Sequence, residues 1–230
     1  SPSLTYHRGG RQFIDKSVYP DVEEFWDDLC AAYRKEVSLL ADAGCTYLQL
    51  DDTTFAMLCD PNVRDQMSER GDVPDQLISI YARGIELALS ERPSNMTVTV
   101  HMCRGNFKSS WIAEGGYEPV AEKMFAGVPV DGFFMEWDTD RAGGFEPLRY
   151  APRDKMIVLG LVSSKLSNLE TKDHLKRRVD EATRYIPLEN LCLSPQCGFA
   201  SMALGNNVSE SDQWRKLALV VETAEEIWGK

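Results

Sequence analysis

The sequence predicts an α/β fold, specifically a (β/α)8 TIM-type barrel of which this chain supplies about five βα units. Helical segments alternate with short apolar segments along the 230 residues. The apolar segments are almost continuously hydrophobic, as expected for parallel strands that are buried on both faces. Polar side chains capable of chemistry follow one strand after another, which is typical of the C-terminal face of a barrel.

Apolar residues at helical spacing and the residues at segment ends predict the helices. Gly44 ends the first helix and Pro74 begins the second. The predicted helices are residues 21–43, 74–91, 117–126, 171–186 and 209–228. The predicted strands are Tyr47–Leu50, Thr97–Met102, Gly132–Glu136, Met156–Val162 and Leu191–Ser194. We expect each strand to be followed by a helix.

An open doubly wound sheet is the alternative to a barrel. No Gly-x-Gly-x-x-Gly turn follows a predicted strand, which disfavours a nucleotide-binding sheet of this type. Five units do not close an eight-stranded barrel, and residues 1–11 read as the loop that follows an earlier strand. We therefore expect residues 1–230 to be the C-terminal part of one barrel domain whose upstream strands are absent. A separate upstream fragment is then a candidate partner.

Composition excludes several classes of protein. The chain has 25 Lys and Arg against 36 Asp and Glu, and this net charge of −11 disfavours binding to nucleic acid. No apolar run approaches the roughly 18 residues of a membrane span, and no secretory leader is evident. We therefore expect a cytoplasmic protein with no membrane partner. Its six cysteines are then expected to be reduced thiols or metal ligands.

One group of residues at strand ends has the composition of a metal site. His101 and Cys103 flank the end of one strand and, two residues apart, point to the same side. Glu136 ends the next strand, and Cys197 follows the last one between Pro195 and Gly198. Two thiolates, an imidazole and a carboxylate suit Zn²⁺. Taken singly, a Cys, His or Glu at a strand end more often has a structural role than a metal-binding one. No C-x-x-C or H-E-x-x-H spacing accompanies these residues to favour a metal site.

Three segments carry a family resemblance. They are His-Met-Cys-Arg-Gly-Asn at 101–106, Asp-Gly-Phe-Phe-Met-Glu-Trp-Asp at 131–138 and Leu-Ser-Pro-Gln-Cys-Gly-Phe-Ala-Ser at 193–201. Their order and spacing resemble the catalytic domain of cobalamin-independent methionine synthase, and most closely its short single-domain relatives in the superfamily that includes uroporphyrinogen decarboxylase. Tyr-Leu-Gln-Leu-Asp-Asp at 47–52 also resembles a strand of that family. The resemblance covers essentially the whole chain, without the family's upstream strands.

The resemblance implies a zinc-dependent methyltransferase of methionine biosynthesis. His101, Cys103, Glu136 and Cys197 match the family's zinc ligands, and Asp51 matches the carboxylate that binds the amino group of the thiol substrate, homocysteine or a similar thiol. Asp52 stands where the long enzymes have Glu, and Thr53-Thr54 replace their Pro-Ala. These departures leave the amino-acid substrate open.

The implied mechanism is methyl transfer to a thiol. Coordination by zinc converts a thiol, with an ordinary pKa near ~8.5, into a nucleophilic thiolate. If the thiolate replaces Glu136, the net charge of the metal and its ligands stays at −1, so we expect Glu136 to be the exchangeable ligand. The methyl donor stays open among methyltetrahydrofolate, its polyglutamate form, a methylated corrinoid protein and a small S-methyl compound.

The remaining candidates are weaker. Asp51 has an alternative role as a helix N-cap, although Asp52 can fill it. Arg8 and Arg11 are candidates to clamp a substrate carboxylate, or are surface residues beside turn glycines. Other residues singled out are His7, without an assigned role; His174, expected in solvent; Trp111 and Trp137, candidates to stack on a pterin or to pack; Cys30, Cys45, Cys59 and Cys192, expected in or near the core; and Ser163–Lys165 with Asn206 and Asn207, at the barrel mouth.

Two other functions compete with methyl transfer to homocysteine. The same metal chemistry could alkylate coenzyme M or another thiol, and the departures after Asp51 keep this reading open. A non-catalytic fragment or paralogue is the third reading, because the upstream strands are missing.

Overall fold

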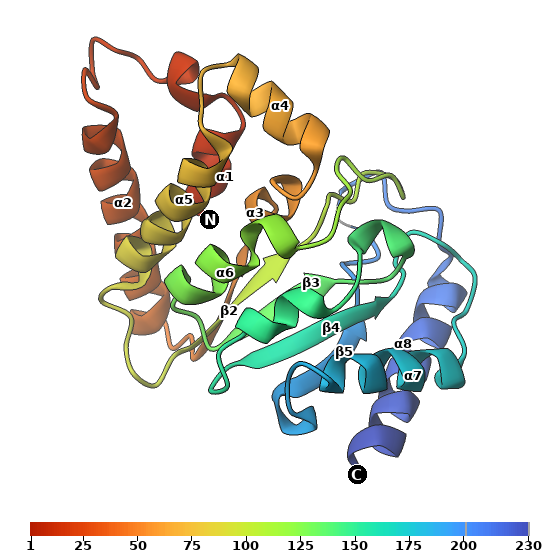
Figure 1. Cartoon of the computed structure of the whole chain (residues 1–230). Coiled ribbons are helices and arrows are strands. Elements are labelled where there is room, and N and C mark those ends of the chain that lie inside the picture. Colours follow the sequence, from red (N-terminus) through yellow and green to blue (C-terminus); the bar gives the residue numbers. More distant parts are fainter. Residues whose placement is uncertain (201, 230) are drawn as a thin grey trace.

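The computed structural model describes residues 1–200 and 202–229 and contains a parallel five-stranded sheet (Figure 1). Its strands are β1 (Tyr47–Asp51), β2 (Thr97–Met102), β3 (Gly132–Glu136), β4 (Met156–Val162) and β5 (Leu191–Pro195). Their order in the sheet is their order along the chain. A doubly wound sheet reverses its order at a switch point. Because the described strands show no reversal, the α/β class is confirmed with consecutive parallel strands, whereas barrel closure stays a prediction.

The helices fall close to their predicted positions. The α-helices are α1 (Pro2–His7), α2 (Val22–Asp42), α3 (Thr54–Met57), α4 (Pro61–Glu69), α5 (Pro74–Leu89), α6 (Glu118–Gly127), α7 (Lys172–Thr183) and α8 (Glu210–Trp228). Short 3-10 helices are η1 (Gly10–Phe13), η2 (Asp140–Ala142), η3 (Glu146–Tyr150) and η4 (Leu188–Asn190). All five predicted helices are present, with ends that differ by at most three residues.

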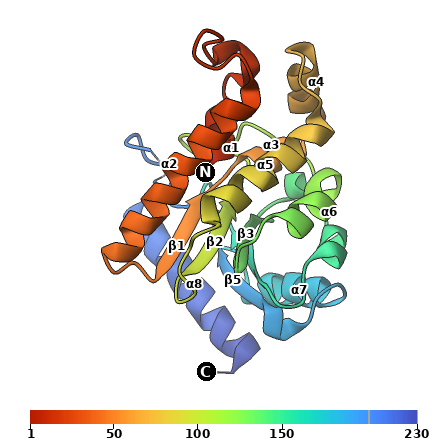
Figure 2. The ribbon, with the colours of Figure 1, turned by 90° about the vertical axis from the view of Figure 1, so that its left-hand side faces the viewer.

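The helices form a row against one face of the sheet, where α2 contacts α5, α5 contacts α6, and α7 contacts α8 (Figure 2). Alternate strand residues such as Val98, Val100 and Met102 are fully buried in the core on that side. On the opposite face Tyr47, Gln49 and Asp51, along β1, are exposed. The strands therefore present a packed outer face and a more open inner face.

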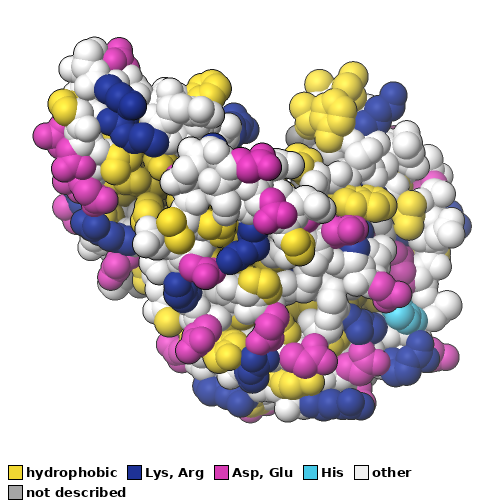
Figure 3. Space-filling model, turned by 45° about the horizontal axis from the view of Figure 1, so that its top comes forward, with side chains coloured by type: hydrophobic (Ala, Val, Ile, Leu, Met, Phe, Trp, Pro, Cys, Tyr) yellow, Lys and Arg dark blue, Asp and Glu magenta, His cyan; other side chains and the backbone are white. Residues whose placement is uncertain are grey.

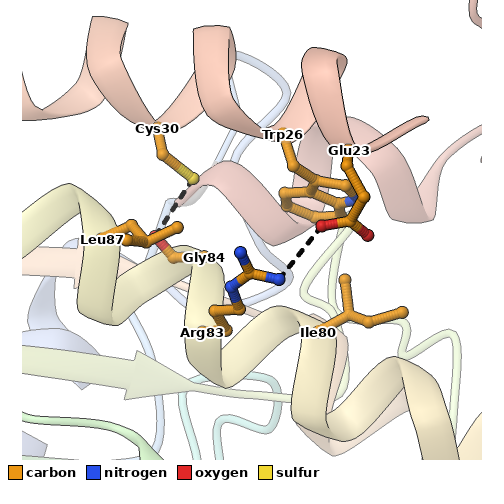
Figure 4. Close-up of a pocket in the computed structure, with 7 residues that line it drawn as sticks. All are labelled: Glu23, Trp26, Cys30, Ile80, Arg83, Gly84 and Leu87. Carbon is orange, nitrogen blue, oxygen red and sulfur yellow. Dashed lines mark hydrogen bonds and ion pairs between the residues drawn. The ribbon is translucent and has the colours of Figure 1, made fainter. Parts of the chain in front are cut away.

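A glycine allows α2 and α5 to pack closely (Figure 4). A Cβ on Gly84 would lie 3.1 Å from the Trp26 ring. The Gly84 carbonyl accepts a hydrogen bond from Cys30 Sγ at 3.5 Å, and Arg83 donates to Glu23 at 3.0 Å. The cavity among these residues holds about 20 Å³, room for little more than one water molecule. This contact is helix packing, and it lies away from the predicted site.

Two expectations about connections are wrong. Residues 1–11, expected to be a loop, contain α1 and the start of η1, because Pro2 at the first helical turn is pre-set for helix. The connection from β3 to β4 holds only η2 and η3, where a helix was expected. Paired glycines at 143–144 and prolines at 147 and 152 interrupt this stretch.

Acidic and basic side chains are interspersed over the face shown in Figure 3, and hydrophobic side chains gather at its top. This face therefore offers no continuous positive surface, in keeping with the negative net charge. None of the helices formed by the described residues has the length and apolar composition of a membrane span.

Candidate metal centre

His101, Cys103 and Cys197 come together although their strands are not neighbours. His101 is in β2, Cys103 follows β2, and Cys197 follows β5, with β3 and β4 between. In a flat sheet three strand spacings span about 14 Å. One ligand atom from each of the three residues nevertheless lies within 4.8 Å of the others. Curvature of the sheet and the turn after β5 therefore bring the two ends together on the inner face.

The three side chains form a donor set that suits zinc. Cys103 is buried, whereas His101 and Cys197 are half-buried. The hydrogen bond to Cys197 and burial raise the pKa of Cys103, because two thiols share a site without a compensating charge. A bound cation reverses this effect and favours thiolates. The Nε2 atom of His101 is buried without a hydrogen-bond partner among the described residues, as expected for an atom that binds a metal. The three residues thus fit a zinc ion.

Glu136, the fourth predicted ligand, is outside this group and binds other partners. It ends β3, and its carboxylate is fully buried. Its Oε1 contacts the guanidinium of Arg141, and its Oε2 accepts the backbone N–H of Arg104 at 2.8 Å. Because Met135 pairs with Met102, Glu136 lies beside Cys103 in the sheet. Glu136 is therefore adjacent to the group of three but is not part of it, and its role as a ligand stays a prediction.

Asp51 lies where two cavities meet. It is opposite His101 in the register of β1 and β2 and is exposed at the strand end. One cavity, of about 430 Å³, is also lined by His101 and Cys197. The other, of about 690 Å³, is also lined by Arg8 and Trp111. Loss of surrounding water raises the pKa of Asp51, the nearby Cys197 and Asp52 raise it further, and His101 lowers it.

Asp52 is a structural residue, although the N-cap of α3 is Thr53 and not Asp52, which was predicted as the cap. Its buried Oδ1 accepts the backbone N–H of Thr54 at 2.8 Å and the Thr54 hydroxyl at 2.6 Å. Its Oδ2 accepts hydrogen bonds from the hydroxyls of Ser1 and Ser3. This carboxylate therefore fixes the turn before α3 and holds the N-terminal segment in place, which leaves Asp51 facing the cavities.

The two predicted arginines differ in their surroundings. Arg8 is exposed at the larger cavity. The guanidinium of Arg11 donates to the carbonyls of Ile14, Tyr19 and Pro20 at 3.3, 2.6 and 3.1 Å. Arg11 thus stabilises the turn that precedes α2, and a carboxylate clamp at either arginine stays a prediction.

Most of the weaker candidate residues are buried or packed against other parts of the structure. His174 is exposed, as expected. Trp137 is buried and donates to the Gly144 carbonyl at 3.1 Å, so it packs, whereas Trp111 is half exposed at the larger cavity. His7 is buried against the Tyr81 hydroxyl at 3.2 Å. The other candidates are Cys30 and Cys59, which are buried; Cys45 and Cys192, which are half-buried; Ser163–Lys165, which are buried; and Asn206, which donates to the Ser164 carbonyl.

Sequence reasoning missed the charged residues around Glu136. Arg141 contacts both Glu136 and Asp138, the latter at 3.0 Å. Burial lowers the pKa of Lys165, whose Nζ has no hydrogen-bond partner among the described residues, while the charge of Asp138 raises it. The available signal was an Asp-x-x-Arg sequence directly after a strand end.

Comparisons with known proteins agree with the resemblance noted in the sequence. Residues 9–225 match the model of the cobalamin-independent synthase catalytic domain. The uncharacterized proteins YxjG and YxjH of Bacillus subtilis are 48% and 46% identical over 99% of this chain. A Listeria monocytogenes structure described as a candidate vitamin B12-independent methionine synthase is 39% identical, with a TM-score of 0.78 over 100% of this chain.

A vitamin B12-independent methionine synthase from a Shewanella species, solved with selenomethionine, shares the fold over 91% of this chain, with a TM-score of 0.66 at 18% identity. The chain covers 60% and 62% of the two Bacillus proteins and 63% of the Listeria chain, so it spans about three fifths of these relatives. Ser201, at the end of the third motif, lies outside the described residues. On the match over residues 9–225, the chain belongs to the cobalamin-independent synthase catalytic-domain family.

Proposed function

We propose that this chain carries the catalytic site of a zinc-dependent methyltransferase that methylates a small thiol, homocysteine or a similar amino thiol. The observation that carries the proposal is the approach of His101, Cys103 and Cys197 to within 4.8 Å of one another beside a cavity that Asp51 also lines. Family membership supports methyl transfer as the reaction. Such a reaction is a step of methionine synthesis.

Each residue has a part in this chemistry. His101, Cys103 and Cys197 would hold the zinc, with Glu136 as the exchangeable fourth ligand. Zinc, when bound, supplies a positive charge that keeps a substrate thiol deprotonated at neutral pH. Asp51, across the same cavity, would accept the ammonium group of an amino thiol and so orient its sulfur toward the metal-binding residues. Coenzyme M is a poorer fit, because its sulfonate and the Asp51 carboxylate are both anionic.

The larger cavity is the proposed site of the methyl donor. Phe107, Trp111 and Ile112 line it and are exposed, and Arg8 lies at the same cavity. A flat apolar ring with an anionic tail, as in a folate, matches an aromatic wall with a nearby guanidinium. Asp51 lines this cavity as well, so thiol and donor would meet at the end of β1.

The five strands are proposed to be an arc of an eight-stranded barrel, with residues 1–230 as the C-terminal part of that domain. Consecutive strand order, helices on one face and polar residues at the strand ends support this arrangement. Barrel closure requires further strands between the free edges of β1 and β5.

Metal analysis with X-ray absorption tests the proposal. We expect the purified protein to bind an equimolar amount of zinc with two sulfur ligands, and homocysteine to add a third sulfur. Cys197→Ser should weaken zinc binding, whereas Cys192→Ser, the matched control at a half-buried thiol outside the group, should not. A panel of donors offered with homocysteine then identifies the methyl source. Absence of zinc, or binding that is unaffected by Cys197→Ser, contradicts the proposal.

A further inference from the structure

The carboxylate of Glu136 has a well-formed binding site of its own. The Arg141 guanidinium contacts Oε1, the backbone N–H of Arg104 binds Oε2 at 2.8 Å, and the carboxylate is fully buried. A buried carboxylate needs such partners, because a bare one is strongly disfavoured. The carboxylate is therefore stable with these partners and is not part of the group of His101, Cys103 and Cys197.

Arg141 is itself held in a fixed place. Its side chain is 7% exposed, and its second contact is Asp138 at 3.0 Å. The Trp111 ring covers the guanidinium at 4.8 Å, and the carbonyl of Arg141 accepts the N–H of Gly115 at 2.8 Å. A guanidinium fixed on several sides can receive a carboxylate with little loss of side-chain entropy.

Arg141 contacts two carboxylates, Glu136 and Asp138, and further cations lie nearby at Arg104 and Lys165. If Glu136 turned to the metal, Asp138 would be the carboxylate that Arg141 still contacts, and a buried guanidinium would lose one of its two anionic partners. Arg141 would therefore compete with the metal for the Glu136 carboxylate.

We infer that Arg141 is the group that receives the Glu136 carboxylate whenever the metal does not hold it, and that it thereby sets how readily a substrate thiol replaces this ligand. The inference rests on the proposed function. If a substrate thiol took the place of Glu136, it would give its proton to solvent and bind as thiolate, and the Glu136 carboxylate would leave as an anion. One anion would replace another, and the Arg141 guanidinium would receive the departing carboxylate.

Arg141→Met separates this role from a merely structural one. Without Arg141, the carboxylate has no competing cation, so zinc should bind more tightly in a chelator competition. A thiol must then displace Glu136 into a buried place without a counter-charge, so the thiol should bind about 10- to 100-fold more weakly. In X-ray absorption spectra, homocysteine should exchange an oxygen ligand for sulfur in the unsubstituted protein, and the oxygen ligand should persist in the variant.

Two further variants complete the experiment. Arg141→Lys keeps the charge but not the planar fork, and it should restore much of the thiol affinity. Arg149→Met is the matched control, since Arg149 also lies in a 3-10 helix after β3 and pairs with a glutamate, Glu118, at the surface. It should leave both affinities unchanged. Arg141→Lys also serves as the test if Arg141→Met does not fold. It should then bind zinc slightly more tightly and the thiol slightly more weakly than the unsubstituted protein.

The results separate the inference from the proposed function. If Arg141→Met weakens zinc and thiol together, or changes neither, the inference is overturned while the proposed function stands. If the unsubstituted protein binds no zinc, both are overturned. Tighter zinc with weaker thiol, and recovery in Arg141→Lys, support the inference.

Discussion

Two adjacent carboxylates at the end of β1 have opposite roles. Asp52 is buried and accepts hydrogen bonds from Thr54, Ser1 and Ser3, whereas Asp51 faces two cavities. Successive strand residues point to opposite faces, so one of any such pair lies inside and the other lies toward the opening. An Asp-Asp pair after a strand therefore indicates one structural residue and one candidate site residue.

Removing the charge of Asp51 should impair binding of an amino thiol. Asp51→Asn should raise the KM for homocysteine about 10- to 100-fold with a much smaller change in kcat, because a charged hydrogen bond contributes about 1.5–3 kcal/mol. A des-amino analogue such as 4-mercaptobutyrate should react equally with both proteins. Because loss of surrounding water in the cavities raises the pKa of Asp51, homocysteine binding should weaken as pH falls through that raised value. Equal loss for both thiols would argue against the ammonium contact.

His7 should make stability depend on pH. Burial, followed by the charge of Arg70, lowers the pKa of His7 to about 4 from 6.5. The unfolded chain therefore binds more protons between these values, so stability is complete above about pH 6.5 and falls toward pH 4. Between pH 7 and 5 the free energy of unfolding should drop by about 2 kcal/mol from this group.

Urea unfolding at both pH values measures this dependence. His7→Asn cannot take up the proton and should flatten the dependence, whereas His174→Asn, at an exposed position, should keep it. An equally steep loss in His7→Asn would assign the effect to other groups.

At the scale of residues, the sequence indicates the side chains of the candidate metal centre better than it indicates the charged residues around them. His101, Cys103 and Cys197 are marked by their place at strand ends. Arg141 comes from an irregular connection, and which carboxylate its guanidinium meets is decided by tertiary packing. The spacing of residues along the sequence carries no signal for such a side-chain contact, so the contact of Arg141 with Glu136 could not be predicted.

Among the elements, those with strong local signals were predicted almost to the residue. Asp21 caps α2, and Ser209 with Asp212 forms a capping box at α8. The apolar, β-branched runs of β2 and β4 coincide with the predicted ranges. By contrast α3 and α4 were missed, since short helices depend on tertiary packing more than on sequence. Asp60 and Pro61 do mark the start of α4, as cap and first residue.

Gly160 in β4 controls how closely the ends of β4 and β5 approach. A Cβ there would lie 2.8 Å from both the Met135 carbonyl oxygen and the Cα of Gln196, the residue before Cys197. Gly160→Ala should therefore displace this turn, destabilise the protein by about 1–3 kcal/mol and weaken zinc binding. Gly132→Ala in β3 is the control, because its nearest contacts are at 3.4 Å. Thermal unfolding and zinc competition measure both effects, and unchanged zinc affinity in Gly160→Ala would contradict this assignment.

For the molecule as a whole, the sheet is curved and its two outer strands have free edges. Another cavity, of about 620 Å³, lies along β5 and α8 and is lined by apolar residues including Leu191, Val220 and Trp228. In the proposed barrel, upstream strands and helices would cover both β1 and this cavity. The fold class and strand order followed from the sequence, because each βα unit is a local pattern. Closure depends on contacts between distant segments, and no local pattern determines it.

Hydrogen exchange tests the proposed closure. In the isolated 230-residue chain we expect the backbone amides of β1 that face the free edge to exchange quickly, and a co-expressed upstream segment from a longer homologue to protect them. The amides of β3, which has a neighbour on each side, should be protected in both samples and serve as the internal reference. Protection of β1 that is independent of the added segment would contradict the proposed barrel.

The consecutive order of the strands has a consequence for synthesis. His101 and Cys103 leave the ribosome well before Cys197, which follows the last strand. The earlier units can pack against their neighbours as they emerge, but the three side chains of the candidate metal centre meet only after β5 has docked. Of the proposed ligands, a chain that stops short of β5 has His101, Cys103 and Glu136 but lacks Cys197, so we expect it to hold the ion weakly. Retention of the ion would then distinguish finished molecules from incomplete ones.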